Sequence, residues 1–493
     1  MKFLAKHKLL LVILVISFFL RIYKFDQLFA YGHDQDLLGW FIKDVLEDRH
    51  IRLVGQETSN QGVFIGPLFY YLLIPFYLLA GMDPIGGIWF SIFIGVAGVA
   101  SFYYVFSKVF NKQVGLISSL VYAVSFNIVF TDRDVVPTSP VMLWTVWYFY
   151  SLFLILKGNQ KYGFLLAGVL FGLIWHINLA LVLVAPLAVL AFILSKKRLE
   201  LINFLYGLII IALLSLPLIF FETRHNFQQI NSVFVALTTN KAHIEGTGIG
   251  LAKLDRTLQL VYKNTTNLFF SFLDSLNVKI TFFALVIGFV FLVKRKVIPL
   301  SVAFLAILWQ LAFIIFFTLN PINISEYYLN GMNVIWILIF SLSAWFIYEK
   351  LNLKFIFFVV ISFFGIVNIY KILTIPVDAS GYQQKKAIVE YIKKDSLEYG
   401  YPCVSISYIT SPGRELGYRY FFWYEKMHVN QPKGGSPVYT IVFPHTKVDR
   451  IDISFGALGL VLPDYERYSK NAVRESCSGA NSNLTDPMFG FTK

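Results

Sequence analysis

The feature that most constrains this chain is a series of long apolar runs separated by short polar segments. Hydrophobic residues make up 57% of the 493 residues and charged residues only 14%, far below the quarter that is usual in soluble domains. Several runs approach or exceed the roughly 18–20 residues that cross a bilayer as a helix. The sequence therefore predicts an α-helical polytopic membrane protein with about eleven transmembrane helices, near 8–22, 85–107, 114–130, 138–156, 163–177, 179–194, 201–220, 277–293, 297–318, 333–348 and 355–373.

The net charge of +13 does not indicate a nucleic-acid partner. Much of the excess lies in short basic clusters between apolar runs, where Lys and Arg set the orientation of a membrane protein. The N-terminal segment, residues 1–20, combines a basic start with an apolar core, as a signal peptide does. It has no small-residue cleavage site and continues directly into Arg21, so we interpret it as a retained first span.

The run from Gly66 to Ala80 decides the topology. When it is left out of the span count, the basic clusters fall on the same side as the basic N-terminus, which makes that side cytoplasmic. The run is short, begins Gly66-Pro67 and contains Pro75, which suits a helix in the outer leaflet better than a full span. The prediction is a multi-pass protein of the plasma (inner) membrane with a cytoplasmic N-terminus and large outer loops at 23–84 and 221–276.

Acidic residues are unevenly divided between the two faces of the membrane. Before the C-terminal region the cytoplasmic side holds only Glu200 and Glu349, whereas the remaining acids lie in outer loops. Acidic residues contribute little to orientation during insertion, so topology does not explain this skew. A function at the outer face explains it and predicts an extracytoplasmic active site.

From about residue 376 the composition becomes that of a soluble domain, 376–493, which the parity of the spans places outside. Its pattern predicts a small α/β fold, with helices at 383–397 and 414–425 and strands at 404–408, 438–443 and 458–462. The two cysteines of the chain, Cys403 and Cys477, lie in this domain. An oxidising compartment permits a disulfide between them, and two unpaired, unreactive thiols are the alternative.

Two Asp-x-Asp motifs lie on the outer side, each beside the end of an apolar run: Asp34-Gln35-Asp36 and Asp132-Arg133-Asp134. In an extended segment residues i and i+2 point to one face, so each pair could hold a divalent cation or a sugar hydroxyl. On a helix the two carboxylates would diverge. A solvated loop is the alternative explanation of either motif.

Two further outer segments carry candidate binding residues. Arg224 can bind a lipid phosphate through two donors, with His225 beside it, and pairing with Glu222 or contact with bulk headgroups is the alternative. Glu326 and Tyr327, between the ninth and tenth predicted spans, are candidates for lining a site. An aromatic belt at the membrane interface is the commoner role of such tyrosines.

The order of these features resembles that of the GT-C membrane glycosyltransferases, specifically the clan of protein O-mannosyltransferases and lipid A aminoarabinose transferases. A first span is followed by an acidic outer loop, an interfacial helix that opens Gly-Pro-Leu-x-Tyr-Tyr at 66–71, and later a basic hairpin at 108–113. Asp34-Gln35 lies where the clan usually has Asp-Glu, so Gln35 departs from its pattern. Residues 132–140 lie at the second outer loop of the clan, and 222–225 resembles a recurrent element of its bacterial members. The resemblance covers roughly residues 1–375 and does not extend to the soluble domain.

The resemblance implies a transferase that takes a sugar from a polyprenyl-phosphate donor at the outer face of the membrane. A hydroxyl or amine of a lipid, glycan or protein acceptor attacks the anomeric carbon with inversion, and the lipid phosphate leaves. Such chemistry needs a base beside the acceptor and cations around the phosphate. The expected catalytic residues are Asp34, as the base, and Asp36. The expected acceptor-binding residues are Asp132, Asp134, Glu326 and Tyr327, the expected lipid-phosphate-binding residues are Arg224, His225 and Arg133, and the candidate ligands of a possible divalent metal are Asp34, Asp36 and Asp132.

Two other functions compete with this interpretation. A glycan polymerase or ligase would use a polyprenyl-diphosphate donor, so the identity of the donor separates it from a polyprenyl-phosphate transferase. A transporter or flippase of lipid-linked sugars usually carries ionisable residues at mid-membrane and an internal repeat. The predicted spans are almost free of charge and show no repeat, which favours chemistry at the surface. The expected partners are the bilayer, the lipid-linked sugar and its acceptor.

Overall fold

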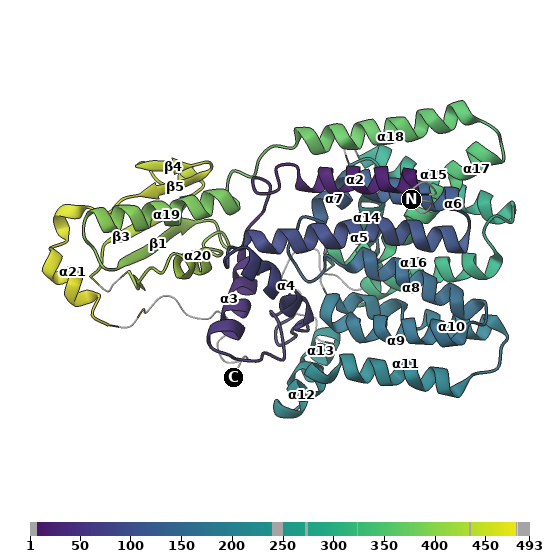
Figure 1. Ribbon diagram of the computed structural model, residues 1–493, viewed down its shortest axis with the longest axis horizontal. Helices are drawn as coiled ribbons and strands as arrows, with labels where there is room; N and C mark the ends of the chain where they lie inside the picture. Colours follow the sequence, from purple (N-terminus) through teal and green to yellow (C-terminus); the bar gives the residue numbers. More distant parts are fainter. Residues whose placement is uncertain are drawn as a thin grey trace.

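The computed structural model describes residues 7–238, 250–271, 275–322, 324–432, 435–479 and 481. It consists of a bundle of apolar helices with a small α/β domain attached to one end (Figure 1). The predicted apolar segments all form helices, α2 (Lys8–Ile22), α5 (Ile85–Val109), α6 (Lys112–Val124), α8 (Val141–Leu156), α9 (Gln160–Ile177), η1 (Leu179–Val184) with α10 (Leu187–Ser195), α11 (Leu201–Leu214), α15 (Ser275–Lys294), α16 (Leu300–Leu319), α17 (Asn333–Glu349) and α18 (Lys354–Thr374).

The number of candidate spans is smaller than the number of apolar segments. By length and hydropathy, six of the described helices can cross a bilayer, and a seventh is added when α11 and α12 (Leu216–Arg224), bent by 55°, count as one span. The helices α6 and α8 are shorter, and the predicted run 114–130 breaks at Ser125 before α7 (Phe126–Thr131). The chain is thus a helical multi-pass membrane protein with six or seven candidate spans by this measure.

Small residues allow close packing inside the bundle. A Cβ atom placed on Gly168 of α9 would lie 2.5 Å from the carbonyl oxygen of Gly207 in α11, so both backbones approach because neither residue has a side chain. Such small-residue contacts are the usual way in which apolar helices associate in lipid. The larger core around them is aromatic and aliphatic, with Trp309 of α16 among its largest fully buried side chains.

Short helices gather at the end of the bundle that bears the α/β domain. There α3 (His33–Glu47) and α4 (Leu68–Leu79) lie between the long helices and the sheet, and α12 and α13 (Gln228–Thr238) lie at the end of α11 (Figure 1). The helix predicted at 66–80 is therefore present as α4, which has 12 residues and Pro75 inside it. Its position in the membrane stays a prediction. The remaining elements of the membrane part are α14 (Leu251–Asn267) and η2 (Glu326–Met332).

The C-terminal domain contains a five-stranded mixed sheet in the order β2-β1-β3-β5-β4. Strand β1 is parallel to β2 and β3, and β5 is antiparallel to β3 and β4. Its elements are α19 (Tyr382–Glu398), β1 (Val404–Thr410), α20 (Arg419–Tyr424), β2 (Val429–Asn430), β3 (Val438–Phe443), η3 (His445–Lys447), β4 (Ile453–Phe455), β5 (Leu458–Val461), η4 (Tyr465–Arg467) and α21 (Lys470–Ser476).

The predicted strands and the first predicted helix of this domain are confirmed, but the second helix is shorter than predicted. It begins at Arg419 rather than at residue 414 because Gly413 and Gly417 adopt positive φ angles of 85° and 90°, which favour a loop. Strands β2 and β4 were not predicted, because two or three residues are too few to show the alternation of apolar and polar residues that marks a strand.

The α/β domain is fixed to the first outer loop rather than connected by a free linker. Its Tyr420 and Phe421 belong to the same buried cluster as Phe41 of α3 and Tyr70 of α4. Polar contacts reinforce this core, since Asp83 accepts hydrogen bonds from the hydroxyl of Tyr382 (2.7 Å) and from Lys386 Nζ (2.6 Å). The domain and the loop therefore form one packed unit.

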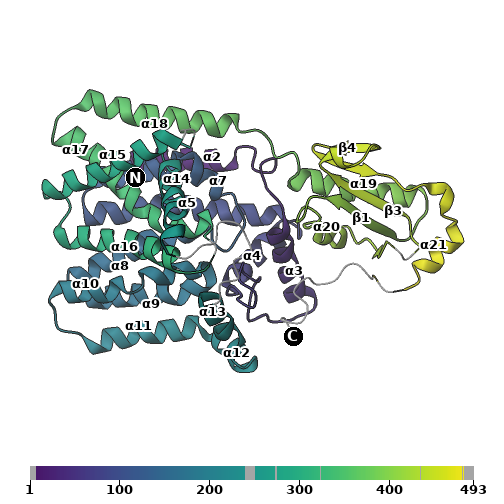
Figure 2. The same cartoon turned by 180° about the vertical axis from the view of Figure 1, so that it is seen from behind.

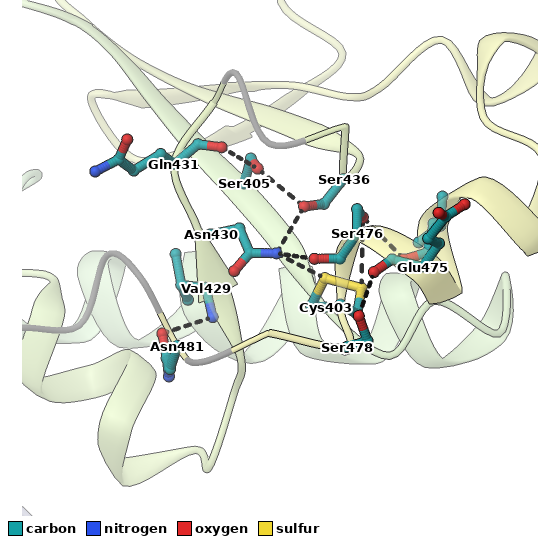
Figure 3. Close-up of a disulfide and its surroundings, with 12 residues drawn as sticks. Cys403, Ser405, Val429, Asn430, Gln431, Ser436, Glu475, Ser476, Ser478 and Asn481 are labelled. Carbon is teal, nitrogen blue, oxygen red and sulfur yellow. Dashed lines mark hydrogen bonds between the residues drawn. A yellow bond between two sulfur atoms is a disulfide. The ribbon is translucent and has the colours of Figure 1, made fainter.

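From the sequence alone it was undecided whether Cys403 and Cys477 form a disulfide. The structure contains this disulfide, and it ties α21 to the start of β1 (Figure 3). The side-chain amide of Asn430 donates to Cys403 Sγ (3.2 Å), to Ser436 Oγ (3.2 Å) and to the carbonyl oxygen of Ser476 (3.1 Å). These bonds fix the short strand β2 beside the disulfide.

Candidate active site

Helix α3 begins at the first Asp-x-Asp motif. The Gln35 side-chain oxygen accepts the N–H of Gly32 at 2.9 Å and so closes the first turn. Acids are favoured in the first turn of a helix because they face its positive end. Residues 34–36 are therefore helical, and Asp34 and Asp36 diverge, as the sequence predicted for the helical case, because successive helical residues are rotated by about 100°.

The amide of Gln35 joins α3 to the second motif. Its nitrogen donates to Asp134 Oδ1 at 3.2 Å and to the carbonyl oxygen of Val135 at 3.4 Å. This contact holds the loop after α7 against the first turn of α3. As a result Asp34 and Asp134, which are 100 residues apart in the chain, line the same cavity.

The cavity has a volume of about 450 Å³ and is lined by polar groups in one part and by apolar side chains in another. Polar groups come from the first outer loop, the loop after α7 and the end of α9. Its apolar walls come from η1, α13 and α16. The polar lining residues are Asp34, Gln56, Glu57, Thr58, Ser59, Asn60, Asp134, Thr138, Asn178, Tyr327 and Tyr328, and the apolar ones include Ile177, Leu183, Val233, Ala236, Leu237, Phe316 and Phe317.

The surrounding protein changes the acidity of both carboxyl groups, although both residues are solvent-exposed within the cavity. Desolvation raises the pKa of Asp34, an effect that His33 and Gln56 partly oppose. Desolvation and the nearby charge of Asp34 raise the pKa of Asp134 to about 6. A carboxylate whose pKa approaches the working pH is a stronger base than an ordinary exposed one, and it is still ionised at neutral pH.

Asp36 lies on the other side of α3, against the C-terminal domain. Its Oδ1 accepts the backbone N–H of Tyr420 at 3.0 Å and the hydroxyl of Tyr31 at 3.5 Å. Burial raises its pKa to about 6. The structure therefore does not bring Asp36 into the cavity that contains Asp34.

Asp132 and Arg133 are buried outside the cavity as well. Asp132 accepts two hydrogen bonds from the guanidinium of Arg21, at 3.0 and 2.6 Å, and one from the hydroxyl of Tyr122 at 3.3 Å. The guanidinium of Arg133 donates to the carbonyl of Leu20. These contacts join the loop after α7 to the end of α2.

Arg224 and His225 end helix α12 and do not line the cavity. The ring of His225 stacks on Phe221 and its Nδ1 lies 2.8 Å from the carbonyl oxygen of that residue. Arg224 is exposed. The alternative pairing of Arg224 with Glu222 is not seen, because the buried Glu222 instead accepts the backbone N–H of Ile230 at 3.3 Å in the following helix α13.

Glu326 and Tyr327, the two candidates from η2, lie in different surroundings. Tyr327 lines the cavity and its hydroxyl lies 3.1 Å from Ser59 Oγ. Glu326 points to solvent and forms an exposed ion pair with Lys263 at 2.8 Å. Only Tyr327 of this pair therefore joins Asp34 and Asp134 at the cavity.

Several residues of the site were not found in the sequence. Gln56, Thr138 and Asn178 face the cavity as single polar residues in loops, and no motif marks them. Gly66 of the Gly-Pro motif packs against His176, because a Cβ atom there would lie 2.2 Å from the imidazole Nδ1. His176 thus closes the wall behind the cavity as a packing residue, with its Nε2 2.9 Å from the carbonyl oxygen of Leu214.

The carboxylates predicted to share a metal do not meet. Asp34, Asp36 and Asp132 face the cavity, the C-terminal domain and Arg21, respectively. Within the described ranges no three His, Cys, Asp or Glu side chains are grouped as a metal site needs. No Lys or Arg among the described residues lines the cavity either.

Comparisons with known proteins identify a related family and a related fold. Residues 65–220 match the family of dolichyl-phosphate-mannose-protein mannosyltransferases. No curated protein sequence matches the chain significantly. The fold is that of ArnT from Cupriavidus metallidurans, solved with bound undecaprenyl phosphate, with a TM-score of 0.61 at 9% identity over 94% of this chain and 99% of ArnT. An oligosaccharyltransferase from Archaeoglobus fulgidus, solved with zinc and sulfate, matches with a TM-score of 0.50 at 11% identity, over 88% of this chain and 67% of that one.

The matched segment and the fold define the class: the chain is a membrane glycosyltransferase of the GT-C type. The resemblance to the clan of protein O-mannosyltransferases and aminoarabinose transferases, found in the order of sequence motifs, is thereby confirmed. The matched segment begins just before α4 and covers the second Asp-x-Asp motif and the helices up to α12.

Proposed function

We propose that the protein transfers a sugar from a polyprenyl-phosphate donor to a hydroxyl-bearing acceptor in the cavity lined by Asp34 and Asp134. The observation that carries the proposal is the cavity itself, in which two carboxylates stand opposite apolar walls. A lipid-linked sugar has the same division into a polar and an apolar part. The name of the matching family specifies a dolichyl-phosphate sugar, which agrees with such a donor.

Asp34 acts as the base in this reaction. The acceptor oxygen attacks the anomeric carbon while Asp34 takes its proton, and the bond from that carbon to the phosphate oxygen breaks with inversion. Asp134 lies beside Asp34, and its negative charge strengthens the base by opposing the loss of the proton from Asp34. Gln35 holds the two residues together.

The lipid chain of the donor lies along α13 and α16. Phe316 lines the cavity and also a neighbouring apolar groove formed by Ala312, Ile315 and Leu319 on the surface of α16. A polyprenyl chain can therefore pass from the cavity to the outer surface of the bundle without crossing a polar barrier. Helix α4 contributes no lining residue to the cavity.

Arg224 is the proposed phosphate contact at the edge of this path. It is exposed at the end of α12, and the next helix, α13, forms a wall of the cavity. A phosphate that enters along α13 from the membrane surface passes the end of α12, where a guanidinium can bind it through two donors. His225, fixed against Phe221, supports that helix end.

The shorter apolar helices complete the membrane domain in this proposal. They lie beside the six long helices in the bundle (Figure 2). We therefore infer that α2, α6, α8 and α10 also cross the bilayer, which would thin around them, and give about eleven spans. The helices at the end of the bundle that bears the α/β domain, namely α3, α4, α12 and α13, then lie with that domain on the extracytoplasmic side. The cytoplasmic N-terminus follows from the basic clusters at the opposite end.

The experiment is release of polyprenyl phosphate by the purified protein from a panel of polyprenyl-phosphate sugars, with native membrane extract as acceptor. Wild-type protein should release the lipid phosphate, and the Asp34→Asn variant should lose about 10²–10⁴-fold in rate. Asp34→Asn protein with an unchanged melting temperature and near-normal turnover would contradict the assignment of the base. Release from polyprenyl-diphosphate glycans alone would instead indicate a polymerase or ligase.

A further inference from the structure

Strand β1 of the C-terminal domain has an open edge that the proposed reaction does not use. It pairs with β3 from Ser405 to Thr410, but with the edge strand β2 only at Val404 and Ser405. In the described part of the chain, β2 is the outermost strand on that side. The segment from Ile406 to Thr410 therefore lacks a strand neighbour on one side.

The hydrogen bonds of β1 show which peptide groups face the open side. Ser405 donates its N–H toward β3, to the carbonyl oxygen of Pro437 at 2.7 Å, whereas Val404 donates toward β2. The direction of the peptide groups alternates along a strand. Tyr408 and Thr410 therefore direct their N–H and C=O groups to the open side.

Strand β2 is short for a physical reason. The side chain of Asn430 is held by the disulfide and by Ser436 (Figure 3), and the next residues are Gln431 and Pro432. Proline has no N–H and cannot continue a ladder of hydrogen bonds. The chain consequently leaves the edge of β1 after Asn430 and exposes the rest of that edge.

A groove runs along the open edge toward the first turn of α3. It consists of two adjoining cavities, of about 240 and 450 Å³, which share Ile406, Tyr408 and Glu415. The outer end is bounded by two prolines and the inner end by His33 and Asp36 of α3. Helix α20 lies between β1 and α3 at this place (Figure 2).

The inner end of the groove lies close to the proposed base. Residues i and i+2 of an α-helix have Cα atoms about 5 Å apart, so Asp36 in the groove and Asp34 in the catalytic cavity are separated by less than one turn of α3. A long ligand that fills the groove therefore ends across α3 from the reaction site, about one helix diameter away.

We propose that this groove binds an extended polypeptide, the acceptor of the transferase, which adds as a strand to the open edge of β1. The edge presents peptide donors and acceptors that repeat along the strand, and another backbone is the ligand that repeats with the same spacing. A glycan has no such regular row of groups. The role as acceptor rests on the proposed function, whereas the mode of binding rests on the edge itself.

The first test uses peptides and the unmodified full-length protein in detergent, without a sugar donor. The probes are four fluorescent seven-residue peptides in which Ser or Thr alternates with Val or Tyr, and binding is followed by fluorescence anisotropy. Each is also made with N-methyl groups on either all odd or all even residues. One of these two sets should bind at least tenfold more weakly and the other within twofold of the parent, because only alternate N–H groups face β1. Equal binding of both sets, or no binding of any parent peptide, overturns the proposal.

The second test changes the protein edge. Tyr408→Pro removes one N–H that faces the groove and leaves the ladder to β3 intact, and Tyr408→Phe is the matched control that retains it. The proline variant should bind the parent peptides at least tenfold more weakly, and the phenylalanine variant within twofold of wild type. Equal binding by a folded proline variant contradicts the proposal. If that variant does not fold, the N-methylated peptides still decide, since they leave the protein unchanged.

Failure of the docking mode and failure of the proposed reaction can be told apart. Asp34→Asn protein should bind the peptides as wild type does, because docking does not involve the base. Peptide binding without release of lipid phosphate from any donor would refute the reaction and leave the docking mode. Release of lipid phosphate to an acceptor that is not a protein, with no peptide binding, would refute the docking mode alone.

Discussion

The side-chain amide of Gln35 donates a hydrogen bond of 3.2 Å to the carboxylate of Asp134, across 99 residues of sequence. This bond connects α3 to the loop after α7, the two segments that supply Asp34 and Asp134 to the cavity. The sequence showed Gln35 only as a departure from the usual Asp-Glu pattern of its clan. In the structure it positions Asp34 and Asp134 relative to each other, so its effect on catalysis is indirect.

Replacing this amide should reduce turnover more than binding. Gln35→Ala loses both the bond to Asp134 and the cap on Gly32, and misplacement of a catalytic group by about 1 Å can cost on the order of 10²-fold in rate. We expect kcat for the release of lipid phosphate to fall by about that factor with little change in KM. Gln35→Glu is the companion variant, which adds a negative charge beside Asp134 and should move the acidic limb of the pH profile to higher pH. Normal kcat in Gln35→Ala would show that the bond does not position the base.

Activity should decline as the pH falls through the pKa of Asp34, because a base must be ionised to accept a proton. Desolvation raises that pKa, and the pKa of the neighbouring Asp134 is raised to about 6 by desolvation and by the charge of Asp34. The interaction of two charges is reciprocal, so removing the charge of Asp134 lowers the pKa of Asp34. Asp134→Asn should therefore shift the acidic limb of kcat against pH to lower pH. Thr138→Val, which changes the same cavity without a charge, should leave the limb in place, and an identical limb in both variants would contradict the coupling.

Asp36 should prove important for structure and dispensable for the chemical step. Its carboxylate accepts the N–H of Tyr420, and its pKa is raised to about 6 by burial. A raised pKa in the folded state means that ionised Asp36 costs stability, a cost that begins above the unfolded value and is complete above pH 6. Asp36→Asn keeps an acceptor oxygen without the charge, so it should be more stable than wild type above pH 6 and equal to it below about pH 4. Asp36→Ala leaves the N–H of Tyr420 unpaired and should lose about 1–3 kcal/mol.

Thermal unfolding from pH 4 to 8, alongside the assay for lipid phosphate, tests both roles of Asp36. Retained turnover in Asp36→Asn is expected. A loss of turnover equal to that of Asp34→Asn, with the stability unchanged, would restore Asp36 as a catalytic residue.

The sequence predicted the helices and their class well, and the site only in part. Long apolar runs form helices wherever they occur, because a bilayer leaves the backbone no other partner for its hydrogen bonds. Asp34 was singled out by its motif and by the resemblance to the clan, and its role as the base stays a prediction. The partner of Asp34 could not be chosen, since whether Asp36, Asp132 or Asp134 faces the same cavity depends on the first turn of α3 and on the Gln35 amide.

Tertiary contacts also decided which charged residues are structural. Nothing local to Asp132 shows that Arg21, 111 residues earlier, will pair with it inside the bundle. The open edge of β1 could not be predicted from the sequence either, because the two-residue strand β2 has no recognisable sequence pattern. Single residues in loops, such as Asn178, carry no signal that separates a cavity wall from solvent.

The buried pair of Arg21 and Asp132 should dominate the stability of the outer end of the bundle. Arg21 is fully buried and Asp132 is 4% exposed, so removing either partner leaves the other charge without compensation, at a cost of about 3–5 kcal/mol. We expect Asp132→Ala and Arg21→Ala to lower the unfolding midpoint strongly in detergent. The double variant Arg21→Met/Asp132→Leu should recover much of the loss, because no unpaired charge remains. Loss of turnover in a double variant of wild-type stability would support the acceptor role predicted for Asp132.

The disulfide between Cys403 and Cys477 should stabilise the C-terminal domain, because it closes a loop with a sequence separation of 74 residues. Such a cross-link restricts the unfolded chain and is typically worth about 2–4 kcal/mol. Cys403→Ala, Cys477→Ala and the double variant should lose the same amount, because each removes the same bond and the effects of residues acting as one unit do not add. Chemical unfolding of the three variants, with reduced wild type as the control, measures this. Losses in the two single variants that sum to the loss in the double variant would mean that the cysteines act separately.

The same disulfide can be used to test the topology. In membranes isolated with thiols blocked, the wild-type cysteines should accept a maleimide label only after reduction, as an extracytoplasmic domain requires.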